Sequence, residues 1–152
     1  MAIRNIIQLG DPTLRKKSFE VTDFGEKTHQ LLNDMRETLK KADGVGLAAP
    51  QVGVLRRVFI ISFEDKYFEC INPVMVSQSG RQSGQEGCLS VKGKWGEVVR
   101  PNKVTVKAFD RNGKPFTVEA EGFLARAFCH EYDHLDGIVY VDKAISVQED
   151  RT

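Results

Sequence analysis

Two histidines, His130 and His134, stand four residues apart in the stretch HEYDHLDG, and Glu131 follows the first of them directly. On an α-helix this spacing places both imidazoles on one face, within reach of a single metal ion. The carboxylate of Glu131 would then lie beside an open metal position, where it could take a proton from bound water. We therefore interpret HEYDH as the water-activating part of a metal site rather than as two hydrogen-bonded core histidines.

A catalytic metal site of this type needs a third protein ligand and keeps one position open. Zinc proteases share the two-histidine motif, and the usual protease pattern continues with a ligand downstream. Here the possible ligands downstream are all acidic and none stands at a familiar spacing, among them Asp136, Asp142 and Glu149. Cys88, in QEGCLS, lies in a polar, glycine-rich stretch rather than an apolar one, and it is the best candidate for the third ligand.

The other possible ligands fit less well. Cys129 is next to His130 and about 100° round the helix from it, so the two are not expected to bind one ion. Cys70 lies inside an apolar, strand-like run, and His29 stands among polar residues of a helix. The alternative explanation for Cys88 is a small buried side chain, which is the usual role of a free cysteine.

A third stretch, GVGLAAPQVG at 44–53, combines glycines with a glutamine that its small apolar neighbours do not shield. Gly44 and Gly46 permit another chain to approach the backbone closely. The amide of Gln51, at the edge of a cleft, is a suitable donor to a developing oxyanion. The alternative is a helix C-cap followed by a loop with a small-residue packing site.

The composition is that of one soluble globular domain over residues 1–152, with 41% hydrophobic and 28% charged residues. A net charge of +1 gives no sign of a basic surface that binds nucleic acid. No apolar run approaches the roughly 18 residues of a membrane span, and the N-terminus does not match a signal peptide. Three cysteines, an odd number, argue against a disulfide framework, so we expect a reducing, cytoplasmic location.

Strands and helices occupy separate parts of the chain, which predicts an α+β fold. Leucines at helical spacing predict an amphipathic helix over 26–42, with Gly44 as its C-cap. A buried strand is expected at 56–62, and further strands on either side of a break at Asn72-Pro73.

The clearest strand pairing is antiparallel. Asn112-Gly113 predicts a hairpin between the strands 103–110 and 115–121. The first of these strands alternates, which places three apolar side chains on one face: Val104, Val106 and Ala108.

Residues 122–135 predict a second long helix, which carries HEYDH. Its inward stripe is expected to contain Phe123, Ala127, His130 and His134. Asp133 faces another direction, and we interpret it as a solvated or helix-packing carboxylate.

Three motifs in this order, GVGLAAPQ, EGCLS and HEYDH, resemble the signature motifs of the peptide deformylase family at every defining position. GDPTLR, VRP and DRNGKPF extend the resemblance over nearly the whole chain. The uninterrupted spacing of the first two motifs and the end at Thr152 resemble the shorter bacterial class, without a long C-terminal extension. The resemblance implies antiparallel β-sheets packed around a central helix that carries the HEXXH motif.

The family removes the formyl group from the N-terminal formyl-methionine of nascent polypeptides and releases formate. The resemblance implies that Cys88, His130 and His134 hold the metal, typically Fe²⁺, with Zn²⁺, Ni²⁺ or Co²⁺ able to substitute. It also implies that Glu131 is the general base and acid. We expect metal-bound hydroxide to attack the formyl carbon, and we expect thiolate and Fe²⁺ together to make the activity sensitive to oxygen.

The resemblance assigns further residues to the oxyanion and the peptide. Gln51 and the backbone N–H of Leu89 match the oxyanion donors. Val45 and Gly46 match the loop whose backbone pairs with the substrate as a strand does, and Gly87 matches the opposite edge.

We also expect a pocket for the methionine side chain of the substrate, and residues beneath the site that stabilise it. Glu86 and Arg100 match an ion pair beneath the site. The stem of Arg126, one residue off the inward stripe, could close the pocket rim. Plain core packing is the alternative for Phe123. The expected pocket lining is Val45, Phe123, Ala127 and His130.

Two positions leave the peptide preference beyond methionine open: Lys92, where the family usually has proline, and Trp95 nearby. The expected partners are N-formylmethionyl nascent peptides, met near the ribosome by a monomer, with no direct nucleic-acid binding and no membrane. A zinc endopeptidase is the alternative enzyme. A metal-stabilised structural module is the alternative without activity, although it would need a closed, four-ligand site.

Overall fold

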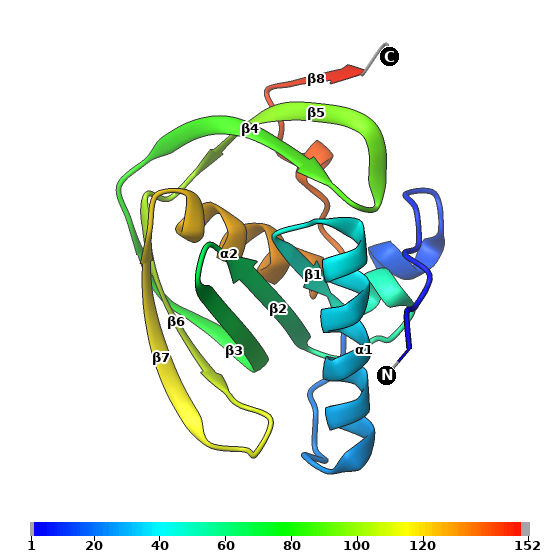
Figure 1. Ribbon diagram of the computed structural model, residues 1–152. Coiled ribbons are helices and arrows are strands. Elements are labelled where there is room, and N and C mark those ends of the chain that lie inside the picture. Colours follow the sequence, from blue (N-terminus) through cyan, green and yellow to red (C-terminus); the bar gives the residue numbers. More distant parts are fainter. Residues whose placement is uncertain (1, 150–152) are drawn as a thin grey trace.

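The computed structural model describes residues 2–149, and it confirms the α+β fold with antiparallel sheets (Figure 1). The helices are α1 (Glu26–Ala42) and α2 (Phe123–His134), with short 3₁₀ helices η1 (Pro12–Arg15), η2 (Ala49–Val52) and η3 (Tyr140–Asp142). The strands are β1 (Gly46–Ala48), β2 (Val58–Phe63), β3 (Lys66–Ser79), β4 (Gln82–Cys88), β5 (Val91–Arg100), β6 (Lys103–Phe109), β7 (Pro115–Glu121) and β8 (Ser146–Glu149).

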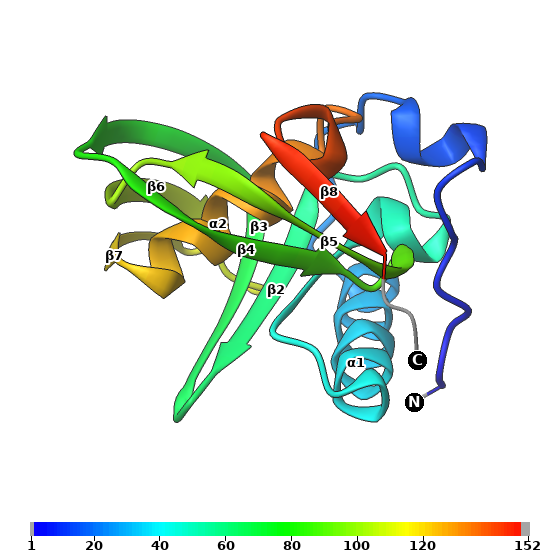
Figure 2. The same cartoon turned by 90° about the horizontal axis from the view of Figure 1, so that it is seen from above.

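The strands form a five-stranded sheet in the order β1-β2-β3-β6-β7 and a three-stranded sheet in the order β4-β5-β8. Every pair of named strands is antiparallel. Helix α2 runs between the β4–β5 hairpin and the large sheet, while α1 lies to the side (Figures 1 and 2). The helix with HEYDH is therefore central, as predicted.

Strand β2, next to the edge strand β1, is buried on both faces because a helix covers each of them. Phe59 and Ile61 pack in the cluster that contains the apolar side of α2, where the ring of Phe128 lies 5.8 Å from that of Phe59. Val58 and Ile60 pack with α1. A strand buried on both faces has no polar alternation, which is why residues 58–61, within the predicted segment 56–62, are a continuous apolar run.

The predicted hairpin is confirmed, with β6 paired to β7 from Lys103↔Glu121 to Phe109↔Pro115. Gly113 has a φ of 80° in its turn, a conformation that L side chains rarely adopt. The expected inward residues of β6 are at most 2% exposed: Val104, Val106 and Ala108.

Two details of the sequence interpretation are wrong. The left-handed residue that ends α1 is Asp43, with a φ of 54°, not Gly44. Gly44 is instead required for space, because a Cβ there would lie 2.9 Å from a methyl carbon of both Leu39 and Leu89. The Asn72-Pro73 pair does not end a strand, since β3 continues through it as a bulge, with Asn72 at a φ of 50°.

The β4–β5 hairpin and the segment around η3 form an apolar cluster of their own, which consists of Val91, Val98, Val139 and Tyr140 with partly buried neighbours. Within residues 2–149, no helix has the length and apolarity to cross a bilayer.

Candidate metal centre

Cys88, His130 and His134 are brought together although one comes from the end of β4 and two from α2. One ligand atom from each lies within 4.8 Å of the others, and no second group of this kind occurs in the described part of the chain. The sulfur of Cys88 lies 3.4 Å from Nε2 of His134. Cys88 therefore lies beside the two histidines, where the sequence predicts the third ligand.

The rejected ligands lie elsewhere. Cys70 is buried in β3, and Cys129 is buried on the apolar side of α2. Nε2 of His29 is 2.6 Å from the carbonyl oxygen of Arg111, so this histidine links α1 to the β6–β7 turn. None of the three belongs to the ligand group.

The donor set and its charge fit a first-row divalent cation. One thiolate and two imidazoles suit Fe²⁺, Zn²⁺, Ni²⁺ and Co²⁺ alike and leave room for an exchangeable ligand. Burial alone would lower the pKa of His130, yet Cys88, Glu131 and Glu86 raise it well above the usual value. The protein thus surrounds this position with negative charge, which favours a bound cation.

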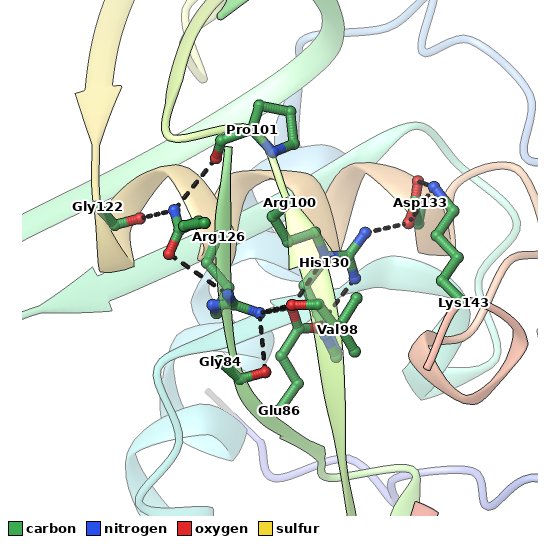
Figure 3. Close-up of polar contacts among 11 residues, drawn as sticks. Gly84, Glu86, Val98, Arg100, Pro101, Gly122, Arg126, His130, Asp133 and Lys143 are labelled. Carbon is green, nitrogen blue, oxygen red and sulfur yellow. Dashed lines mark hydrogen bonds and ion pairs between the residues drawn. The ribbon is translucent and has the colours of Figure 1, made fainter. Parts of the chain in front are cut away.

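Glu86 orients the first histidine from beneath (Figure 3). Its Oε1 accepts the Nδ1 proton of His130 at 2.9 Å, an assignment that leaves Nε2 of the ring as the metal donor. Arg100 donates two hydrogen bonds of 2.9 Å to the same carboxylate, from Nε and from Nη2. Burial opposes the charge of Glu86, but these partners outweigh it and hold its pKa well below the usual range.

Asp133 extends this network, so of the two predicted roles, a solvated or a helix-packing carboxylate, the solvated one is wrong. It is 9% exposed and accepts a hydrogen bond of 2.7 Å from Nη1 of Arg100 (Figure 3). Nζ of Lys143 lies 3.1 Å from the same carboxylate oxygen and 3.3 Å from the other one. The sequence held one indication of this contact. The guanidinium of Arg100 has five N–H donors, more than the carboxylate of Glu86 alone can accept, so a second acceptor was to be expected.

Glu131 is 4% exposed and faces Gly46 across the site. A Cβ on Gly46 would lie 2.5 Å from Oε2 of Glu131, so only glycine leaves room for the carboxylate. Oε1 has no hydrogen-bond partner among the described residues. Burial raises the pKa of Glu131 to about 7, and the charge of a nearby cation would lower it again.

Gln51 is held so that its amide N–H₂ faces the cysteine. The backbone N–H of Ala48 donates to its Oε1 at 2.9 Å, which fixes the oxygen on the far side. Nε2 then lies 3.0 Å from the hydroxyl of Ser90 and 3.5 Å from the sulfur of Cys88. Ser90, fully buried, is a contact that the sequence did not indicate.

A cavity of about 310 Å³ opens beside these groups. Leu89 follows Cys88 in the turn after β4 and lines the cavity with Gly87. β1 and β4, which carry Gly46 and Gly87, are each the outermost strand of their sheet. The predicted residues that line the cavity are Val45, Gly46, Gln51, Glu86, Gly87, Cys88, Leu89, Phe123, Arg126, Ala127, His130 and Glu131.

One side chain of α2 differs from its expected placement, and a second makes a further contact. Phe123 is 47% exposed at the start of the helix, with its ring centre 4.8 Å from that of Phe63, so it does not face inward. Arg126 lines the cavity but is 5% exposed, and its guanidinium donates to Glu86 beneath the pocket, a contact that the sequence did not indicate. Lys92 and Trp95 do not line the cavity.

Comparisons with a family model, with related sequences and with solved structures all point to the same protein family. Residues 3–150 match the family model described as polypeptide deformylase. The chain is 54% identical to the peptide deformylase of Caldicellulosiruptor bescii over 95% of this chain and 87% of that protein. It is 55% identical to that of Lachnoclostridium phytofermentans, over 94% and 90%.

Solved structures agree in fold. The crystal structure of a peptide deformylase from Legionella pneumophila has a TM-score of 0.91 and 47% identity, and covers 93% of this chain and 86% of that one. That of the Synechococcus elongatus enzyme in complex with actinonin has a TM-score of 0.91 and 38% identity, with 93% and 79% covered.

Proposed function

The chain belongs to the polypeptide deformylase family, metal-dependent hydrolases that remove the formyl group from nascent peptides, and we propose that Cys88, His130 and His134 hold its metal. The observation that carries this assignment is the convergence of three ligand atoms within 4.8 Å of one another, beside a buried glutamate. A cation there supplies a Lewis acid that polarises the formyl carbonyl and acidifies a water ligand.

Glu131 is the general base and then the general acid. Its carboxylate takes the proton from the attacking water and returns it to the leaving amine nitrogen, so that formate and a free N-terminus are formed. The unpartnered Oε1 supports this role, because a buried carboxylate oxygen without a donor is free to accept that proton.

Gln51 and the backbone N–H of Leu89 hold the negative charge that develops on the formyl oxygen. The amide of Gln51 is fixed before the substrate arrives, since Ala48 anchors its oxygen. Donors that need no reorganisation are worth most in the transition state.

The peptide backbone lies as a strand between the two open sheet edges. Val45 and Gly46 on one side and Gly87 on the other offer backbone groups to it. The methionine side chain enters the cavity between Val45, Ala127 and His130, with Phe123 at the mouth and the stem of Arg126 as part of the wall.

Deformylation of formyl-Met-Ala-Ser by the purified chain tests the assignment. We expect one metal ion per chain, formate release from this peptide and no cleavage of casein. Hydrolysis of casein would favour an endopeptidase, and one bound metal without any hydrolysis would favour a structural module. The geometry argues against the module, because the ligand group has three members and leaves a position open.

We propose Fe²⁺ as the metal in the cell, with Zn²⁺, Ni²⁺ or Co²⁺ as substitutes. A thiolate ligand and ferrous iron are both oxidisable, so we expect protein purified anaerobically to lose most of its activity after aerobic storage. The same protein reloaded with Ni²⁺ is the matched control and should stay active. Elemental analysis before and after storage checks this prediction, and an iron-loaded sample that keeps full activity in air would contradict it.

The substrate suggests where the enzyme works. Nascent formylmethionyl chains emerge at the ribosome, so we propose a cytoplasmic monomer that meets them there. A net charge of +1 supports contact with the peptide rather than with nucleic acid.

A further inference from the structure

The strand with the cysteine and the helix with the histidines share no apolar cluster in the described part of the chain. The apolar side of α2 packs on the large sheet, around Phe59, Ile61 and Val106. Cys88 packs instead against the separate cluster that contains Val98 and Tyr140. The ring of His130 stacks on that of Tyr140 with 6.0 Å between their centres, and the other side-chain contacts between β4 and α2 are mainly polar.

Arg126 supplies the largest set of such contacts (Figure 3). Its Nη1 has three acceptors within hydrogen-bond distance: Oε2 of Glu86 at 2.6 Å, the carbonyl oxygen of Val98 at 3.0 Å and that of Gly84 at 3.4 Å. The two protons of this nitrogen are therefore shared among three oxygens. Its Nη2 lies 3.4 Å from Oε1 of Gln82. One buried guanidinium on α2 thus reaches backbone or side-chain atoms of both β4 and β5.

Gln82 closes the same connection at the start of the helix. Its amide nitrogen donates to the carbonyl of Gly122, the residue before α2, at 2.7 Å and to that of Pro101 at 3.1 Å. Arg126 and Gln82 therefore connect residues 82, 84 and 86 of β4 to the start of α2.

We propose that Arg126 is a positioning residue, which holds β4 on α2 and so fixes the distance from Cys88 to His130 and His134. This inference rests on the proposed metal role of these three residues. Its function differs from that of Arg100, which orients the Glu86 carboxylate with two hydrogen bonds. Without Arg126, Glu86 keeps Arg100 and His130 as partners, but the carbonyls of Gly84 and Val98 lose their donor.

The test is the rate at which Co²⁺-loaded protein releases its metal to a chelator. Arg126→Met keeps the stem that lines the pocket and removes the guanidinium. We expect it to release Co²⁺ about tenfold faster than the parent chain, as is usual when support around metal ligands is lost. Arg126→Lys, which keeps a donor, should fall between the two.

Arg111→Met is the matched control. Arg111 also forms a two-armed ion pair, with Glu69 at 2.7 and 2.9 Å, but it lies in the turn after β6 and does not line the cavity. Its loss should leave metal release unchanged. Equal acceleration by both variants would assign the effect to general destabilisation and overturn the proposal.

Gly84→Val changes the contact between β4 and Arg126 by a substitution on β4. This variant tests the proposal if Arg126→Met does not fold. A Cβ at Gly84 would lie 3.0 Å from Nη2 of Arg126, so the valine should push the guanidinium aside and accelerate release as well. Parent-like release from folded variants would overturn the proposal. A parent chain that binds no Co²⁺ through Cys88 would instead contradict the proposed metal site.

Discussion

Replacing Glu131 with alanine is expected to leave the metal bound and to lower kcat by about 10³-fold, the range of a lost general base. The side chain is no part of the ligand group, so its removal leaves Cys88, His130 and His134 in place. What is lost is the group that accepts the proton of the attacking water. The measurement is kcat on formyl-Met-Ala-Ser, with metal content determined on the same sample.

Glu131→Gln separates charge from shape, because the amide fills the same space but cannot take the proton. It should be as inactive as the alanine variant and bind the metal equally well. Glu119→Ala, at an exposed position of β7, is the control and should behave as the parent chain. A glutamine variant with more than about a tenth of the parent kcat would rule out the base role.

Gly46→Ala perturbs the same carboxylate without changing it. The added Cβ would lie 2.5 Å from Oε2 of Glu131, so one of the two groups must move. Loss of activity in this variant, with metal content unchanged, would show that the position of the carboxylate matters as well as its presence.

The two histidines of the proposed metal site could be predicted from the sequence because helix geometry fixes their relative positions locally. The i, i+4 spacing alone places His130 and His134 on one face, and the Asn112-Gly113 turn alone fixes the β6–β7 register. Cys88 could be predicted only as the ligand that the helix lacks, since nothing local to it requires a metal.

Apart from the pair of Glu86 and Arg100, which the resemblance implies, the support beneath the site could not be predicted, because it joins residues far apart in the chain. Arg126 and Glu86 are 40 positions apart, and Arg100 and Asp133 are 33 apart. The motif positions also gave no sign that Phe123 would be exposed at the start of α2. A polar, glycine-rich strand such as β4 looks like a loop when its stabilising partners are charged side chains on another element.

Replacing Glu86 with leucine is expected to destabilise the protein by about 3–5 kcal/mol, the range for breaking a buried ion pair from one side. The side chain of Glu86 is 4% exposed, and two guanidinium groups and one imidazole converge on it. Leucine fills the space but leaves Arg100 and Arg126 without their shared acceptor. Urea unfolding of the metal-free protein measures the change, since metal binding would otherwise contribute to stability.

Glu69→Leu is the matched control. Glu69 also accepts two hydrogen bonds from one guanidinium, that of Arg111, but this arginine is partly exposed. Water can solvate Arg111 once its partner is lost, so the loss should be near 1 kcal/mol. Equal losses in the two variants would mean that burial of Glu86 adds nothing to its ion pairs. A larger loss for Glu86→Leu, together with faster metal release, would show that one buried carboxylate both stabilises the β4–α2 contact and orients His130.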